Sequence, residues 1–121
     1  MARMIVEAIV AAGMARPGTR DPIPVTISVT NSAGVPITNL NQSNILIGDT
    51  WGTQRLVVQG FQGGTMQIGL GATNAGGLYT CELLPIASAN WTPWTSYHVV
   101  IVVTQGSNHG QTIAELTFPH P

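Results

Sequence analysis

The stretch from Val25 to Gly34 reads VTISVTNSAG and is the clearest indication of the fold. Val25, Ile27 and Val29 alternate with hydroxylated residues, and this period of two predicts a β-strand with one buried face. The tetrapeptide that begins at Asn31 predicts a turn, because Asn and Gly tolerate the positive φ angles of tight turns. The stretch therefore predicts one strand and the turn that ends it.

Further β-rich segments, separated by turn-forming residues, follow along the chain. They predict strands at about 43–47, 55–59, 65–70, 77–84, 96–104 and 111–118, with residues 105–110 as a hairpin-like connection. No segment predicts a convincing helix. The pattern predicts an all-β, antiparallel β-sandwich of about seven or eight strands, in one domain that spans residues 1–121.

Residues 3–12 allow two interpretations. As a strand they place four apolar side chains on one side, namely Met4, Val6, Ala8 and Val10. As a short helix they would instead use Ile5, Ile9 and Ala12. The density of Ile and Val and the lack of an N-cap residue favour the strand. Whether such a strand stays in its own sandwich or joins the edge of a neighbour is left open by the sequence.

Charged residues make up 7% of the chain, against about 25% in an average soluble domain. The four cations are all arginines and the formal net charge is -1, so we expect no nucleic-acid partner. No apolar run reaches the ~18 residues of a membrane-spanning helix, and we expect no membrane insertion. Glu7 interrupts the apolar stretch near the start, which argues against a signal peptide. The uncharged polar composition favours an extracellular or cell-surface location.

Residues that could carry out catalysis are few and scattered. The carboxylates are isolated along the chain, as solvated surface charges are: Glu7, Asp21, Asp49, Glu82 and Glu115. Cys81 is in phase with Tyr79 and Leu83, so we expect a buried, unreactive thiol rather than a nucleophile. As the single cysteine it cannot form an internal disulfide. The sequence therefore predicts a protein without enzymatic activity.

Motifs that bind metals or cofactors are also missing from the sequence. His98, His109 and His120 lie on a predicted strand, in the hairpin connection and at the tail, without the close spacing of zinc ligands. Asp21 and Asp49 each offer a single loop carboxylate to calcium, which is too little to predict a site. We therefore expect no metal and no cofactor.

Two stretches resemble bacterial immunoglobulin-like and adhesin modules. Residues 24–37, PVTISVTNSAGVPI, resemble the second strand and turn of these modules, which often carry the pattern V-x-V-x-V-x-(D/N)-x-x-G-x-P. The second stretch contains GLYT at 77–80, Leu84-Pro85, Trp91 and YHVVIVV at 97–103. The resemblance covers residues from about 23 to 118. It implies an immunoglobulin-like sandwich with a structural, adhesive or ligand-presenting role, and it brings no catalytic residues.

The three tryptophans are candidate contact residues. Trp51 lies in the predicted loop GDTWG, and Trp91 and Trp94 lie in NWTPW. Trp91 has the position expected of an aromatic residue that closes one end of the sandwich in the resembled modules. For any single tryptophan, closing an open end of the sandwich is the more common role. Trp51 and Trp94 are the better candidates for exposure, where their rings could stack on a sugar or anchor a protein partner.

The predicted strand at 96–104 is apolar on both faces. Tyr97, Val99, Ile101 and Val103 form one face, but Val100 and Val102 make the other face apolar as well. Because a sandwich strand normally presents a polar face to water, we expect the second face to be covered. The cover would be the first or last segment of the chain, or another subunit.

These observations predict a non-enzymatic structural or binding module that self-assembles or docks in a larger particle or surface fibre. The predicted partner-binding residues are Val100, Val102, Trp51 and Trp94, and a homo-oligomer is expected. The alternative is a carbohydrate-binding module that uses Trp51 and Trp94 as exposed stacking platforms.

Overall fold

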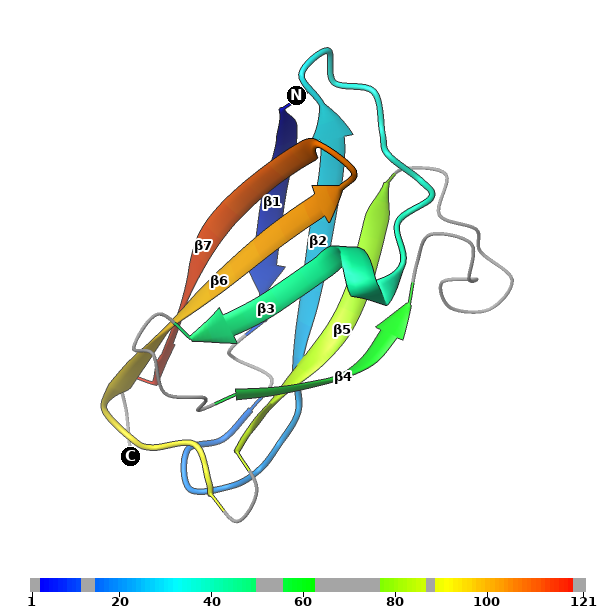
Figure 1. The fold of residues 1–121 in the computed structure, drawn as a ribbon. Coiled ribbons are helices and arrows are strands. Elements are labelled where there is room, and N and C mark those ends of the chain that lie inside the picture. The colour runs from blue at the N-terminus through cyan, green and yellow to red at the C-terminus, as the bar shows by residue number, and fades with distance from the viewer. Residues whose placement is uncertain (1–2, 12–14, 50–55, 63–76, 87–88, 119–121) are drawn as a thin grey trace.

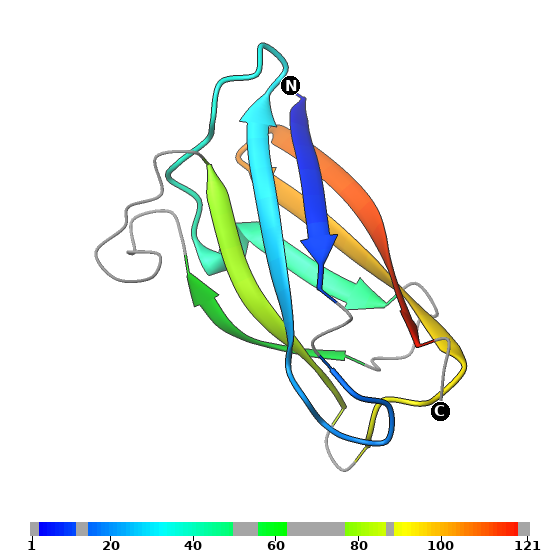
Figure 2. The ribbon, with the colours of Figure 1, turned by 180° about the vertical axis from the view of Figure 1, so that it is seen from behind.

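Seven β-strands form two antiparallel sheets that pack face to face in a computed structural model, which describes residues 3–11, 15–49, 56–62, 77–86 and 89–118 (Figure 1). The strands are β1 (Met4–Val10), β2 (Ile23–Asn31), β3 (Ile45–Asp49), β4 (Leu56–Gln62), β5 (Leu78–Pro85), β6 (Thr95–Gln105) and β7 (Asn108–Phe118). One sheet has the order β1-β2-β5-β4 and the other β3-β6-β7. Figure 2 shows the four-stranded sheet in front, with the three-stranded sheet behind it. The predicted all-β fold with antiparallel sheets is confirmed.

The core lies between the sheets and follows the alternation of the sequence. Inward side chains of β2 (Val25, Ile27, Val29), β5 (Tyr79, Cys81, Leu83) and β6 (Val99, Ile101, Val103) are all buried. In an antiparallel pair the side chains of one strand point alternately to the two faces, so one register brings every second residue into the core. Burial of these side chains from both sheets stabilises the sandwich through the hydrophobic effect.

Residues 4–10 form a strand, so the helical alternative for the first segment is wrong. β1 pairs antiparallel with β2 over its whole length, from Met4 opposite Asn31 to Val10 opposite Val25. Met4 and Val6 are buried, while Ala8 and Val10 pack against the core from partly buried positions. Arg3 makes a parallel bridge to His109 on β7, so β1 contacts both sheets at this side of the sandwich.

The turn after β2 forms as predicted. The side-chain oxygen of Asn31 accepts hydrogen bonds from the backbone N–H groups of Ala33 (2.9 Å) and Val35 (3.0 Å). Gly34 has a φ of 83°, a left-handed conformation that glycine adopts at little steric penalty. The Asn and Gly residues that predicted the turn therefore perform separate roles in it.

Several element boundaries differ from the prediction, among them the end of β4, which was expected at residue 59 and lies at Gln62. The strand expected from residue 43 begins at Ile45, because Gln42–Asn44 form a 3₁₀ turn in which the Asn44 side chain accepts a 2.7 Å hydrogen bond from Asn41 N–H. The connection expected over 105–110 is a tight turn at Gly106 and Ser107, with Gln105 opposite Asn108. Gly106, at φ 61°, suits the first position of a two-residue hairpin turn. The strand predicted at 65–70 lies outside the described residues.

Candidate contact surface on the β3–β6–β7 sheet

β6 is the central strand of the three-stranded sheet, and its outward side chains lie between those of β3 and β7. Val100 has Gly48 on one side and Ile113 on the other. Val102, in the next outward row, lies between Leu46 and Gln111. We call the side chains that point away from the core on these three strands the outer face. The register therefore gathers four aliphatic side chains in its centre: Leu46, Val100, Val102 and Ile113.

The aliphatic centre of the outer face is open to solvent among the described residues. Leu46 is 65% exposed and Ile113 is 62% exposed, while Val100 and Val102 between them are partly exposed. The expectation that the first or last segment of the chain covers Val100 and Val102 is wrong for β1 and β7. β1 belongs to the other sheet, and β7 lies beside β6 as its hydrogen-bonded neighbour.

The opposite sheet has a polar outward row on one of its inner strands, although it also exposes Ile5 and Ile9 on β1 and Leu78 on β5. Its inner strand β2 presents Thr26, Ser28 and Thr30 outward, and all three are partly exposed. These hydroxylated residues suit a sheet face that meets water. The strand β6 has Val100 and Val102 at the comparable outward positions, so these two strands differ in the chemistry of their outward side chains.

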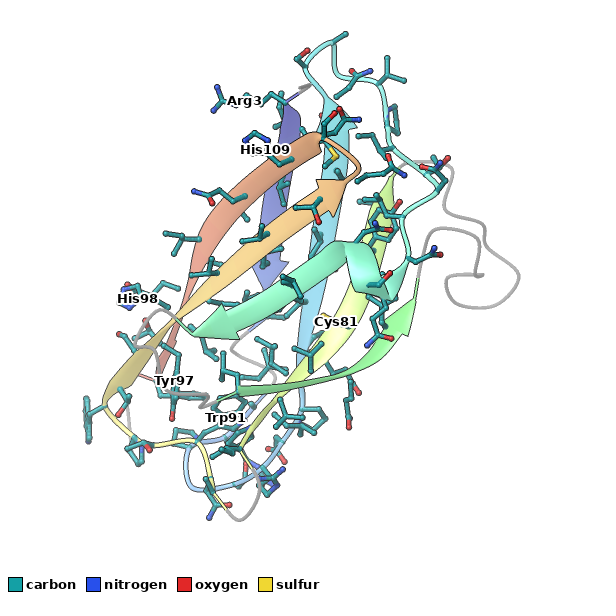
Figure 3. The ribbon with its side chains drawn as sticks, viewed as in Figure 1. Arg3, Cys81, Trp91, Tyr97, His98 and His109 are labelled. Carbon is teal, nitrogen blue, oxygen red and sulfur yellow. The ribbon has the colours of Figure 1, made fainter. Side chains whose placement is uncertain are left out.

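Polar and charged side chains lie at the two ends of the outer face. At one end His98 Nε2 lies 3.2 Å from Glu115 Oε2, and Thr117 donates a 2.9 Å hydrogen bond to the other oxygen of that carboxylate. At the far end His109 lies opposite Thr104 and is exposed. Figure 3 shows His98 and His109 at opposite ends of the sheet. His109 was expected in the hairpin connection and instead lies on β7, because that connection is only a tight turn.

Trp94 is exposed, as expected, and its backbone conformation is unusual. Its side chain is 71% exposed, and its φ of 59° lies in the left-handed region that a bulky residue rarely adopts. Pro93 precedes it in the turn that leads into β6. A turn with proline first and a positive φ second normally has Gly or Asn at the second position. Trp51 lies outside the described residues.

Trp91 is fully buried, as expected of the residue that closes one end of the sandwich. Its ring lies 5.3 Å from that of Tyr97 and 5.5 Å from that of Phe118, measured between ring centroids. Its indole N–H donates a 2.7 Å hydrogen bond to the backbone oxygen of Asp21. Figure 3 shows Trp91 and Tyr97 together at the end of the sandwich from which β6 starts. Trp91 is therefore a core residue.

The Cys81 side chain is buried in the core, as its phase with Tyr79 and Leu83 predicted. Burial raises the pKa of the thiol to about 11, with a smaller contribution from the charge of Glu82. At neutral pH such a group is protonated, and a thiol is a much weaker nucleophile than a thiolate.

Asp21 is held by Arg16 in the connection between β1 and β2. Arg16 Nε donates a 3.0 Å hydrogen bond to the Asp21 carboxylate, and this bond lowers the pKa of Asp21 more than any other contact. The carboxylate also accepts from the Arg16 backbone N–H. Within the described ranges, no group of three or more His, Cys, Asp or Glu side chains is placed to hold a metal ion. No helix in this part of the chain is long and apolar enough to cross a membrane.

The sequence reasoning missed three members of the outer face: Leu46, Gly48 and Ile113. Leu46 left a signal, because it is out of phase with the inward residues Ile45 and Ile47. Ile113 left a similar signal, because it is out of phase with Leu116 and Phe118, two buried residues of β7. Their proximity to Val100 and Val102 depends on strand pairing, which one sequence does not specify.

Comparison of the chain with protein-family models, with curated protein sequences and with solved structures gave no match.

Proposed function

We propose that this chain is an immunoglobulin-like β-sandwich and acts as a non-enzymatic structural module that associates with copies of itself through the outer face. The strand order supports the first part. Sheets β1-β2-β5-β4 and β3-β6-β7 correspond to the ABED and CFG sheets of constant-type immunoglobulin domains. The single Cys81 departs from that pattern, since antibody domains join their sheets through two cysteines.

Tyr97 also supports the immunoglobulin-like assignment. It lies near the start of β6, and its hydroxyl oxygen accepts a 3.2 Å hydrogen bond from the backbone N–H of Thr92, five residues upstream. A tyrosine near the start of strand F whose hydroxyl bonds to the preceding backbone is the tyrosine corner of immunoglobulin-like sandwiches. Trp91 and Phe118 pack around the same ring.

The aliphatic centre of the outer face is the observation that carries the proposed association. Leu46 and Ile113 expose most of their side chains on either side of the central strand, next to the partly exposed Val100 and Val102. The centre of a protein interface is depleted of charge and enriched in apolar area, whereas its rim is polar. The outer face has this arrangement, with His98 and Glu115 at one end and His109 at the other.

Light scattering coupled to size exclusion, over about a hundredfold range of protein concentration, tests the association by mass action. We expect a mass above that of one chain, and we expect the double variant Leu46→Thr with Ile113→Thr to lower it to one chain. Threonine suits a strand, and both side chains are exposed, so the monomer should remain folded. Ile9→Thr, at a 73% exposed position of β1 in the other sheet, is the matched control.

Two results would contradict the proposed association. One is a wild-type chain that elutes as a monomer at every concentration. The other is an oligomer whose mass is unchanged in the Leu46→Thr and Ile113→Thr double variant while the circular dichroism spectrum stays that of the wild type.

Carbohydrate binding is a second candidate function, and the conformation of Trp94 favours it. Trp94 is exposed and has a left-handed backbone conformation, and residues in such strained conformations cluster at binding sites. An exposed indole can stack on the apolar face of a sugar ring. We expect Trp94→Ala to abolish retention on a glycan array if this function is correct, with little change in melting temperature. A large loss of stability would instead make Trp94 a structural residue.

A further inference from the structure

We propose that the outer face packs against the outer face of a second copy. The two copies are related by a two-fold axis that lies between the faces, parallel to the row Ile47, Ile101 and Thr112, so that their β6 strands run antiparallel. This inference rests on the proposed self-association and specifies its geometry. In a two-fold interface both copies use the same patch of surface. If one residue of the first copy contacts a second residue of the other copy, the reverse contact also forms, so every pair occurs twice. The surface must therefore be complementary to itself about one line.

The row Ile47, Ile101 and Thr112 is such a line. Ile47 pairs with Ile101 and Ile101 pairs with Thr112, so the three residues lie side by side across the sheet. When a second copy is turned by 180° about this row, the outward residues on one side of its row lie opposite the outward residues on the other side of the row in the first copy. Val100 then faces Val102 of the second copy, and Val102 faces Val100. Sheets that pack face to face keep their strand directions within about 30° of each other, which this arrangement permits.

On β3 the same axis places the exposed Leu46 side chain of one copy opposite Gly48 of the other, which has no side chain. Leu46 and Gly48 lie at equal distances on either side of Ile47, so Leu46 faces Gly48 of the second copy. Leu46 is largely exposed, and nothing lies within 4 Å of the position that a Cβ atom on Gly48 would occupy. The φ of Gly48 is not positive, so the backbone does not require glycine there. The space beside Gly48 is thus open to the Leu46 side chain of the second copy.

On β7 the axis brings the acidic Glu115 of one copy to the end of the other copy that carries His109 and Arg3. Glu115 and His109 lie three residues on either side of Thr112, so the Glu115 carboxylate faces His109 of the second copy. Both residues are exposed, and Arg3 lies beside His109 through the parallel bridge of β1. Each copy therefore offers the Glu115 carboxylate on one side of the row and the Arg3 guanidinium, next to His109, on the other side. These charges lie at the rim, where they set orientation more than affinity.

A two-fold axis along β6 would also place the two faces together, with Ile113 of one copy opposite Gly48 of the other, but it leaves Glu115 without a cationic partner. In that arrangement His98 of one copy would lie against His98 of the other, because a residue on the axis faces itself. Glu115 would then lie on the β3 side of the second copy, away from His109. The charge arrangement therefore favours the antiparallel arrangement.

Charge reversal tests the geometry with the full chain. His109→Glu places two acidic pairs in the dimer, and Glu115→Arg places two basic pairs there. Because each change alters two rim contacts, we expect either to raise the dimer dissociation constant about tenfold. The double variant restores opposite charges, and we expect its dissociation constant within about threefold of wild type. Glu7→Arg, on β1 in the other sheet, makes the same charge change as Glu115→Arg and should have no effect.

Two further measurements test the same axis. Gly48→Thr fills the open space at this position, so we expect weaker association with an unchanged unfolding midpoint of the monomer. In a mixture of His109→Cys and Glu115→Cys variants, we expect a disulfide-linked mixed dimer under mild oxidation. Either variant alone should cross-link much less, because neither position faces itself.

The outcomes separate this inference from the proposed function. An oligomer that is lost in the Leu46→Thr and Ile113→Thr variant, but in which the charge reversals do not rescue each other, would overturn the antiparallel geometry and leave the association intact. Equal cross-linking in the mixture and in the single variants would overturn it as well. A wild-type monomer at every concentration would overturn both proposals.

Discussion

The indole Nε1–H of Trp91 donates a 2.7 Å hydrogen bond to the backbone oxygen of Asp21, a residue 70 positions earlier in the chain. Two backbone hydrogen bonds flank this contact, from Trp91 N–H to Thr19 O (2.8 Å) and from Gly18 N–H to Trp91 O (2.7 Å). Trp91 thus joins the β1–β2 connection to the segment before β6. Besides packing in the core, Trp91 forms hydrogen bonds with the β1–β2 connection, which has little regular structure.

Trp91→Phe keeps an aromatic ring beside Tyr97 and Phe118 but removes the donor to Asp21 O. Because a buried acceptor loses its partner, we expect the free energy of unfolding to fall by about 1–3 kcal/mol, measured by urea denaturation. Trp94→Phe is the control at an exposed position and should change it by no more than about 0.5 kcal/mol. Equal effects of the two substitutions would show that the hydrogen bond contributes nothing.

The hydrogen bonds of the two buried tyrosines predict which Tyr→Phe substitution lowers the free energy of unfolding more. The Tyr79 hydroxyl donates to Ile37 O at 2.6 Å and accepts from Leu40 N–H at 3.1 Å, whereas the Tyr97 hydroxyl accepts the longer bond from Thr92. We expect Tyr79→Phe to lower the free energy of unfolding by about 2 kcal/mol and Tyr97→Phe by about 1 kcal/mol. Thermal denaturation of the two variants measures the order, and a reversed order contradicts the assignment of these bonds.

Gly110 is needed because β1 approaches β7 closely. A Cβ atom on Gly110 would overlap the backbone carbonyl of Met4, which cannot move without disturbing the β1–β2 pairing. We expect Gly110→Ala to lower the free energy of unfolding by about 1–3 kcal/mol. Gly48→Ala, where the added atom meets nothing within 4 Å, should leave it unchanged or raise it slightly. If urea denaturation finds the two alanine variants equally stable, the close approach of β1 and β7 is wrong.

Trp94→Asn relieves the left-handed strain at the turn before β6. Asparagine adopts a positive φ more readily than other residues with a side chain, and the exposed indole adds little packing. We expect the free energy of unfolding to rise by about 1 kcal/mol, measured by urea denaturation. Trp94→Ala removes the same ring, but alanine does not favour a positive φ, so we expect a smaller rise in the free energy of unfolding. A clear loss of stability in Trp94→Asn would show that the ring supports the fold.

The buried thiol of Cys81 predicts a pH dependence on the alkaline side. The folded pKa is raised to about 11 from the ordinary value of 9.0, so the folded state retains a proton that the unfolded state loses between these values. This contribution to stability is complete below pH 9 and is lost as the pH rises toward 11. We expect the stability difference between wild type and Cys81→Ala to shrink over that range by up to about 2 kcal/mol. A constant difference would contradict the shifted pKa.

Local pattern was sufficient for several parts of the fold and failed for others. The alternation at 25–29 and the Asn and Gly of the following turn predicted β2 and its end, because side-chain direction and turn conformation depend on near neighbours. The hairpin of β6 and β7 was predicted in the right place but with too long a connection. The 3₁₀ turn before β3 was missed, since the Asn41–Asn44 contact that closes it has no strong sequence signature.

The sequence by itself determined which side chains are apolar, that β6 is apolar on both faces, and that Cys81 is buried, because each follows from period-two alternation along one strand. Only the tertiary structure decided what lies beside those side chains. Strand pairing placed Leu46 and Ile113 around Val100 and Val102, and it placed His98 next to Glu115. Alternation specifies the face of a sheet to which a residue points, whereas the neighbouring strand and its register are set by packing between segments far apart in the chain.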